Sequence, residues 1–357
     1  MSIPIFDGHN DTLTHIHDAV GDKARTFLER SDLGHLDLPR AREGGMAGGF
    51  FAVFTANRKW ERTIRPVTGP GGAEVPGAWV VDLPPRLSRS TALSYTLSVM
   101  SDLFRWERAA GGAMKVVRTP GELERCLADG TFAAVLHIEG VEALDTRLEA
   151  LDVFFEAGLR SLGPVWSRPN AFGHGVPFDF PATPDIGPGL TAAGRRLVRA
   201  CNRLGVMVDL SHLNEAGFWD VARISRAPLV ATHSCAWALS PSPRNLTDRQ
   251  LDAVRASGGL VGINFHKGFL RSDGDFKGPA SLTEIARHAR YVADRIGVEH
   301  VALGSDFDGA VMPDDVPDVT ALPAVVAALR DAGFGEADLR LVGTGNWLRV
   351  LRATWHG

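Results

Sequence analysis

Short apolar runs recur along the chain, and most are followed by a segment whose apolar positions repeat with a period near 3.6. Runs of four to eight β-branched, aromatic or aliphatic residues are typical of buried strands, whereas the 3.6 period is typical of amphipathic helices. Eight strands are therefore predicted at 3–6, 47–54, 132–137, 161–165, 206–210, 229–232, 260–265 and 301–303. Helices are predicted at 91–108, 141–157, 192–204, 214–224, 248–256 and 281–296.

Residues at the helix ends agree with this pattern. Asn214 and Ser281 occupy predicted helix starts, and Gly158, Gly205 and Gly297 follow predicted helix ends. Eight strands alternating with helices predict a (β/α)8 TIM barrel that forms a single domain over the whole chain. An open doubly wound sheet is the alternative, but no G-x-G-x-x-G follows the first strand to support it.

Two long Pro/Gly-rich segments interrupt the repeat, at about 57–90 after the second strand and at about 168–190 after the fourth. Loops of this length in a compact domain are usually functional lids or oligomer contacts. We therefore expect both insertions to lie near a binding site or a subunit contact.

Composition narrows the class of protein. A hydrophobic content of 45% and a charged content of 22% are those of an ordinary globular protein. The net charge of −4 predicts no nucleic-acid partner and no anionic membrane partner. The three cysteines lack any C-x-x-C pairing and are predicted to be buried thiols. With no signal-peptide pattern and no long apolar span, a cytoplasmic enzyme is the simplest interpretation.

Candidate chemistry gathers where the predicted strands end. Histidines and carboxylates follow five different strands, and the carboxyl ends of all barrel strands face one mouth. One such residue would mean little, but five placements together indicate a single site. The residues are His9 and Asp11 after the first strand, Glu139 after the third, His212 after the fifth, His233 after the sixth and Asp306 after the eighth.

This set of side chains can hold two metal ions. His9 and Asp11 are two positions apart, so both side chains can leave one face of the chain and bind one ion. His212 and His233 supply two nitrogens to a second ion, and the two oxygens of Glu139 can bridge the pair. Imidazole and carboxylate ligands without thiolate suit zinc, with manganese or cobalt as substitutes. Asp209 is expected either to orient His212 or to cap the strand end.

The sequence resembles the membrane (renal-type) dipeptidases and their bacterial relatives, which are zinc metallopeptidases on a (β/α)8 barrel. The resemblance runs from Phe6-Asp-Gly-His-Asn-Asp11 to Gly345-Asn-Trp-Leu-Arg-Val350. Its most specific parts are residues 9–11, 138–140 and 305–309 and the spacing of the two later histidines. It implies the same ligand assignment as the strand ends, with two zinc ions per chain, and a homodimer is expected from the same resemblance.

Two further residues acquire roles through this resemblance. Arg244 matches the arginine that holds the C-terminal carboxylate of the substrate, a task that suits a guanidinium because it forms two parallel hydrogen bonds with a carboxylate. Asp306 matches the aspartate that contacts the substrate amino group and delivers a proton to the leaving amine. Asp308 is expected to support the loop rather than to react.

One position departs from the family pattern. Where family members commonly carry a histidine that binds the carbonyl oxygen of the substrate, counting 27 residues on from Glu139 reaches Trp166. An indole has one N–H donor and no acid–base capacity. Either the metals stabilise the oxyanion alone, or Trp166 or a nearby residue (Arg168, Asn170 or His174) compensates, or the preferred substrate differs.

The predicted function is therefore that of a dinuclear zinc dipeptidase. A metal-bridging hydroxide is expected to attack the peptide carbonyl, and the C-terminal residue of the dipeptide could be a D-amino acid. The main alternative is a binuclear amidohydrolase acting on a cyclic amide, a lactone or an N-acyl amino acid. Such enzymes often use a carbamylated lysine as the bridge, whereas here Glu139 occupies the bridging position. A non-catalytic barrel that has kept its metal is a further alternative.

Overall fold

The computed structural model describes residues 3–57, 60–61 and 63–356. Arg58, Lys59 and Arg62, which belong to the predicted insertion at 57–90, lie outside the described residues. Within the described part, eight parallel strands form the barrel: β1 (Ile5–Asn10), β2 (Met46–Phe54), β6 (Phe132–Glu139), β7 (Leu159–Gly163), β8 (Met207–Val208), β9 (Val230–Ala231), β10 (Leu260–Ile263) and β11 (Val301–Leu303). This confirms the predicted TIM-barrel fold.

The barrel closes through two short contacts between its two groups of strands. Hydrogen bonds join β1-β2-β6-β7-β8 in one group and β9-β10-β11 in the other. Isolated parallel bridges then pair Asp209 with Val230 and Asn10 with Phe307. A short additional strand, β5 (Met114–Val116), pairs with β6 outside this ring.

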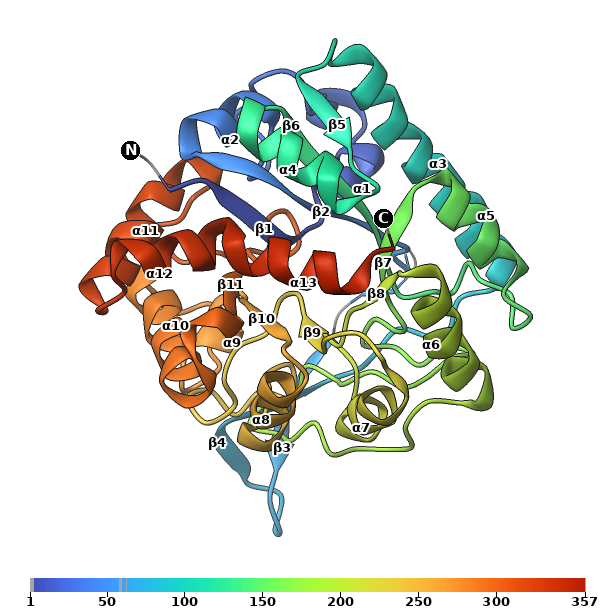
Figure 1. Cartoon of the computed structure of the whole chain (residues 1–357). Coiled ribbons are helices and arrows are strands. Elements are labelled where there is room, and N and C mark those ends of the chain that lie inside the picture. The colour runs from blue at the N-terminus through green and yellow to red at the C-terminus, as the bar shows by residue number, and fades with distance from the viewer. Residues whose placement is uncertain (1–2, 58–59, 62, 357) are drawn as a thin grey trace.

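Helices surround the strands, as Figure 1 shows. They are α1 (Thr12–Asp18), α2 (Leu38–Gly44), α3 (Arg89–Ala109), α4 (Pro120–Asp129), α5 (Glu149–Ala157), α6 (Ala192–Leu204), α7 (Glu215–Ile224), α8 (Asp248–Ala256), α9 (Lys267–Leu270), α10 (Leu282–Ile296), α11 (Leu322–Asp331), α12 (Glu336–Arg340) and α13 (Asn346–Thr354), with short 3-10 turns at Gly21–Lys23, Val298–His300 and Val319–Ala321 and a π-turn at Leu341–Gly345. None of the described helices is long and apolar enough to cross a membrane.

Aromatic side chains fill the end of the barrel opposite the carboxyl ends of the strands. The ring of Trp347 on α13 lies 4.9 Å from Phe50 and 6.2 Å from Phe6, measured between ring centroids. All three are fully buried. Helix α13 therefore closes this end of the barrel, across which it lies in Figure 1. The other end remains available for a site.

Local differences from the predicted elements have clear causes. Helix α5 begins at Glu149 rather than at 141, because the carboxylate of Asp145 accepts hydrogen bonds from the backbone N–H groups of Arg147 and Ala150 and holds a turn there.

Other predictions made from the sequence are confirmed. Asn214 caps α7 as predicted. All three cysteines are buried and unpaired, also as predicted.

The two insertions differ from each other in structure. The first contains a hairpin formed by β3 (Ile64–Thr68) and β4 (Glu74–Val81), which projects from the barrel in Figure 1. Residues 168–190, all of which the structure describes, form no helix or strand. Trp79 and Phe180 exchange two backbone hydrogen bonds of 2.8 Å each, so the two insertions are joined.

His288 on α10 provides a test of this packing through pH. Its Nδ1 accepts the backbone N–H of Ala236 and its Nε2–H donates to the carbonyl of Leu270, so only the neutral ring fits. Burial lowers its pKa from 6.5 to about 4. Between these pH values His288 is therefore protonated in the unfolded chain but neutral in the folded chain. The free energy of unfolding falls as the pH falls through that window.

We expect His288→Gln, which keeps an acceptor and a donor but does not titrate, to weaken this dependence. Between pH of about 7 and about 4.5, the free energy of unfolding of the variant should fall by about 2–3 kcal/mol less than that of the parent. Urea unfolding at both pH values measures the difference. Identical pH dependence in the two proteins would contradict the assignment.

Candidate metal centre

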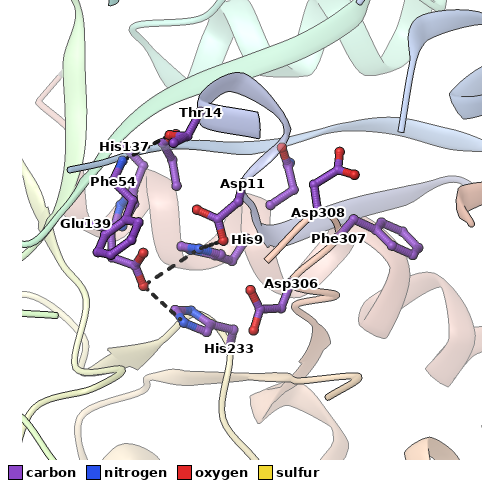
Figure 2. Close-up of polar contacts among 12 residues, drawn as sticks. His9, Asp11, Thr14, Phe54, His137, Glu139, His233, Asp306, Phe307 and Asp308 are labelled. Atoms are coloured by element: carbon purple, nitrogen blue, oxygen red, sulfur yellow. Dashed lines mark hydrogen bonds and ion pairs between the residues drawn. The ribbon is translucent and has the colours of Figure 1, made fainter. Parts of the chain in front are cut away.

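The strand ends bring the predicted ligands together at the open mouth of the barrel. Figure 2 shows His9, Asp11, Glu139, His233 and Asp306 converging on one region, whereas Asp308 points away from it. His9 lies on β1 and Asp11 directly follows it, Glu139 ends β6, His233 follows β9 and Asp306 follows β11. Four of these five are at least 92% buried, the exception being the partly buried Asp11.

A single oxygen lies at the centre of the histidines. Glu139 Oε1 is 3.0 Å from Nε2 of His212, 3.5 Å from Nε2 of His233 and 3.8 Å from Nε2 of His9. The Nε2 atoms of His212 and His233 are 3.1 Å apart. Donors that share one tetrahedral zinc at about 2.0–2.1 Å lie about 3.3 Å from one another. The spacing is therefore that of atoms arranged around a cation.

A second group of donors adjoins the first. Nε2 of His9 is 3.6 Å from Oδ2 of Asp11, and ligand atoms of His9, Asp11 and Asp306 all lie within 4.8 Å of one another. Among the described residues, neither ring nitrogen of the fully buried His9 has a hydrogen-bond partner. Buried polar atoms without a partner are rare in native proteins, and a cation at this point would supply the missing contact.

The electrostatics of the cluster also favour a cation. Burial raises the pKa of Glu139 well above its usual value and lowers those of His212 and His233 well below theirs. Burial also lowers the pKa of His9, but the nearby Glu139 and Asp11 carboxylates outweigh this and raise it to about 10. A divalent cation compensates buried carboxylates and requires neutral imidazoles. The residues therefore fit a metal ion by their chemistry.

Hydroxyl groups hold the outer nitrogens of two histidines. Nδ1 of His212 lies 2.9 Å from Ser167 Oγ, and Nδ1 of His233 lies 2.8 Å from Thr232 Oγ1. The Thr232 hydroxyl donates to Asp209 Oδ2 at 2.6 Å, so its oxygen is left to accept the Nδ1–H of His233. The Nε2 lone pair of His233 then faces the cluster.

Asp209 does not orient His212, contrary to one of the two roles considered from the sequence. Its carboxylate acts on His233 through Thr232, while Ser167 holds His212. It also accepts the backbone N–H of Ser211, two residues on, which matches the other role as a strand-end cap.

Close backbone contacts fix the strands that carry the ligands. A Cβ at Gly262 or Gly304 would lie 1.9 Å from the carbonyl oxygen of Thr232, so only glycine lets β10 and the end of β11 approach the residue before His233. His212 and Asp306 have φ angles of 66° and 62°, a left-handed conformation that is uncommon for residues other than glycine. Such local strain is typical of functional sites.

Asp306 is held by a neighbouring strand. Asn264, which follows β10, donates to Asp306 Oδ2 at 3.0 Å. Burial raises the pKa of Asp306 to about 6. Asp308 instead accepts hydrogen bonds from the Thr12 hydroxyl and the His35 backbone, both at 2.6 Å, and so supports the loop as predicted.

Arg244 lies beside the cluster but behind an aromatic ring. Its guanidinium carbon is 5.2 Å from the centroid of Phe269, its Nη2 donates to the carbonyl of His233 at 3.1 Å, and the side chain is buried. Its Nε is buried without a hydrogen-bond partner among the described residues. Burial lowers the pKa of Arg244, while Asp306 and Glu139 oppose that effect.

Trp166 lines the cavity at the mouth, next to a predicted ligand. Its ring centroid is 5.8 Å from that of His212. Behind it, the fully buried Arg168 donates through Nε to Glu142 at 2.7 Å and through Nη2 to the carbonyl of Thr55 at 2.6 Å. Arg168 therefore supports Trp166 and does not face the cavity.

The site also contains residues that sequence reasoning missed. Ser167, Thr232 and Asn264 form hydrogen bonds with His212, His233 and Asp306, respectively. The buried Asp7 accepts two hydrogen bonds from Ser305, the residue before Asp306. Thr232 and Asn264 carried a usable signal, since each is a polar residue at or near the end of a predicted apolar strand.

A closed parallel barrel with buried histidines and carboxylates at its mouth defines a barrel hydrolase that depends on metal. Comparisons with known proteins identify the family. Residues 1–356 match "Membrane dipeptidase (Peptidase family M19)". The chain therefore belongs to the membrane dipeptidase family, and its activity is that of a metal-dependent dipeptidase.

Similar proteins support this assignment. A crystal structure described as dipeptidase AC, a metallopeptidase, is 48% identical with a TM-score of 0.91 and full coverage of both chains. A metallopeptidase from Rhodobacter sphaeroides, bound to a phosphinate mimic of the dipeptide L-Ala-D-Ala, is also 48% identical with a TM-score of 0.91, covering 99% of this chain and 100% of that one. Dipeptidase tcpJ of Claviceps purpurea is 30% identical over 354 residues, 97% of this chain and 76% of its own.

The ion pair between Arg168 and Glu142 provides a test of how the cavity wall is supported. Removing one partner leaves the other charge buried and unpaired. We expect Arg168→Met and Glu142→Leu each to lower the free energy of unfolding by about 3–5 kcal/mol, and the double variant to lose less than the sum. Urea unfolding of the three variants measures this coupling, and additive losses would show that the pair is not coupled.

Proposed function

We propose that this chain is a dinuclear zinc dipeptidase. His9 and Asp11 would hold one ion, His212 and His233 the other, and Glu139 would bridge them, with manganese or cobalt as substitutes for zinc. Two bound ions would lower the pKa of a water molecule and polarise the carbonyl of the scissile peptide bond. The observation that carries the proposal is the position of Glu139 Oε1 within 3.8 Å of three histidine nitrogens.

Asp306 is the proposed acid that serves the leaving amine. Because Asn264 occupies its Oδ2, Oδ1 is the atom left to hold and deliver the proton. Its raised pKa, about 6, lies near the value at which a carboxyl group can both take up and release a proton at neutral pH. The same carboxylate would bind the free amino group of the dipeptide when ionised.

Arg244 and Trp166 are the proposed contacts for the remaining polar groups of the substrate. The buried Nε of Arg244 has no partner among the described residues, and we assign it as the donor to a terminal carboxylate. The indole of Trp166 lies beside His212 and could offer its N–H to the carbonyl oxygen of the substrate. These roles account for both ends of a dipeptide and for its reacting carbonyl.

The relative from Rhodobacter sphaeroides supports a dipeptide with a D-residue at its C-terminal position, because it binds a mimic of L-Ala-D-Ala. We further propose that residues 1–357 form one catalytic domain, that the protein acts in the cytoplasm, and that it forms a homodimer. Three buried, unpaired cysteines suit a reducing compartment.

Replacing the bridging carboxylate tests the metal assignment. In Glu139→Gln the side chain keeps its size but loses one anionic oxygen, so we expect fewer bound zinc ions per chain and loss of most dipeptide hydrolysis. Metal analysis and an L-Ala-D-Ala hydrolysis assay on the same preparation measure both. Unchanged zinc content together with unchanged turnover would refute the bridging role.

A pair of serine variants separates ligands from neighbouring histidines. Ser167→Ala removes the partner of His212 and should weaken zinc binding roughly 10- to 100-fold. Ser161 Oγ lies 2.8 Å from Nδ1 of His137, a histidine that is not a proposed ligand. Ser161→Ala removes this contact and should leave zinc affinity nearly unchanged. Competition with a zinc chelator measures both affinities. Equal effects of the two substitutions would speak against His212 as a ligand.

A further inference from the structure

The cavity above the candidate metal centre is larger than a small dipeptide needs. Its volume is about 680 Å³, within the range of sites that enclose drug-sized ligands. Glu139, His212 and Asp306 lie among the residues that line it, so the cavity and the proposed reaction centre are continuous. A dipeptide of two alanines would leave much of this space to water.

Four aromatic side chains, Phe54, Trp166, Phe178 and Phe269, form an inner wall next to the metal centre. Phe178 connects them, because its ring centroid lies 5.4 Å from that of Trp166 and 6.5 Å from that of Phe269. It also lies 6.2 Å from the ring of His212. The inner wall therefore begins at a proposed ligand and leads to Phe269, the ring that covers Arg244.

Three further aromatic side chains, Trp79, Phe180 and Phe276, form an outer wall. The rings of Trp79 and Phe180 are stacked with centroids 5.0 Å apart, and Phe276 meets Trp79 edge-on at 6.5 Å. Each comes from a different segment: strand β4, the 168–190 insertion and the loop after α9. Asp179 accepts the backbone N–H of Val81 at 2.8 Å and ties the hairpin to the insertion.

We propose that the two walls form a subsite for a large apolar side chain of the substrate. The inference rests on the proposed dipeptidase function and specifies its substrate: dipeptides with an aromatic or large aliphatic residue, preferred over L-Ala-D-Ala. Burial of such a side chain removes apolar surface from water on both partners, and aromatic rings add edge and stacking contacts. A small side chain gains neither.

The outer wall is the place to test this, because in the described part of the structure its rings contact one another and His266 but no proposed ligand. The assay compares L-Ala-D-Ala with two series of dipeptides, one with Leu or Phe at the first position and one with D-Leu or D-Phe at the second. We expect at least one bulky dipeptide to be hydrolysed with a kcat/KM roughly 10-fold or more above that of L-Ala-D-Ala. Trp79→Ala should remove most of that advantage, mainly through KM, and leave L-Ala-D-Ala hydrolysis nearly unchanged.

Trp219→Ala is the matched control. Trp219 lies on α7, donates to Glu215 and does not line the cavity, so its loss should leave the ranking of substrates as it was. Phe276→Ala is the second test variant if Trp79→Ala fails to fold, which thermal unfolding would reveal. Both test variants act on the outer wall and should change the ranking in the same direction.

The outcomes separate the two proposals. If L-Ala-D-Ala is the best substrate, or if the outer-wall variants slow all dipeptides equally, the subsite is refuted while the dipeptidase function stands. If the parent protein loaded with zinc hydrolyses no dipeptide, the proposed function itself fails.

Discussion

The whole site depends on holding one carboxylate and three imidazoles together where water cannot solvate them. Glu139 Oε1 lies 3.0–3.8 Å from the Nε2 atoms of His9, His212 and His233. Burial raises the pKa of Glu139 and lowers those of His212 and His233, so the protein alone does not favour this grouping. The grouping persists because the surrounding structure fixes the donors. A bound cation would offset the unfavourable free energy of burying these groups.

The barrel fixes these donors from two sides. At the closed end, Phe6, Phe50 and Trp347 fill the interior, so the strands cannot collapse inward. At the open end, Gly262 and Gly304 allow neighbouring strands to approach the carbonyl of Thr232, the residue before His233. Close packing of this kind leaves a ligand little freedom to move away, which is what a preorganised metal site needs.

The sequence was sufficient to predict the fold and the residues that gather at the mouth. Strand ends of a parallel barrel meet at one face whatever the loops do, so Glu139 and Asp306 could be assigned to one site before their distance was known. Their supporting contacts could not be predicted. Arg168 donates to the carbonyl of Thr55, 113 residues away, and Asp209 acts on His233 rather than on His212. Such partners depend on packing that no local pattern encodes, and the pairing of Trp79 with Phe180 is of the same kind.

The residues proposed for the reaction and the residues proposed for substrate selectivity come from different parts of the fold. The proposed ligands stand on the barrel strands or within four residues of their ends, whereas much of the cavity wall comes from the two insertions and the loop after α9. Loops can therefore change the accepted side chain without moving a ligand. Trp166 is where the two parts meet, because its ring contacts His212 on one side and Phe178 on the other. A tryptophan at that point extends the aromatic wall up to the reacting centre, which a histidine in its place would do less well because its ring is smaller and more polar.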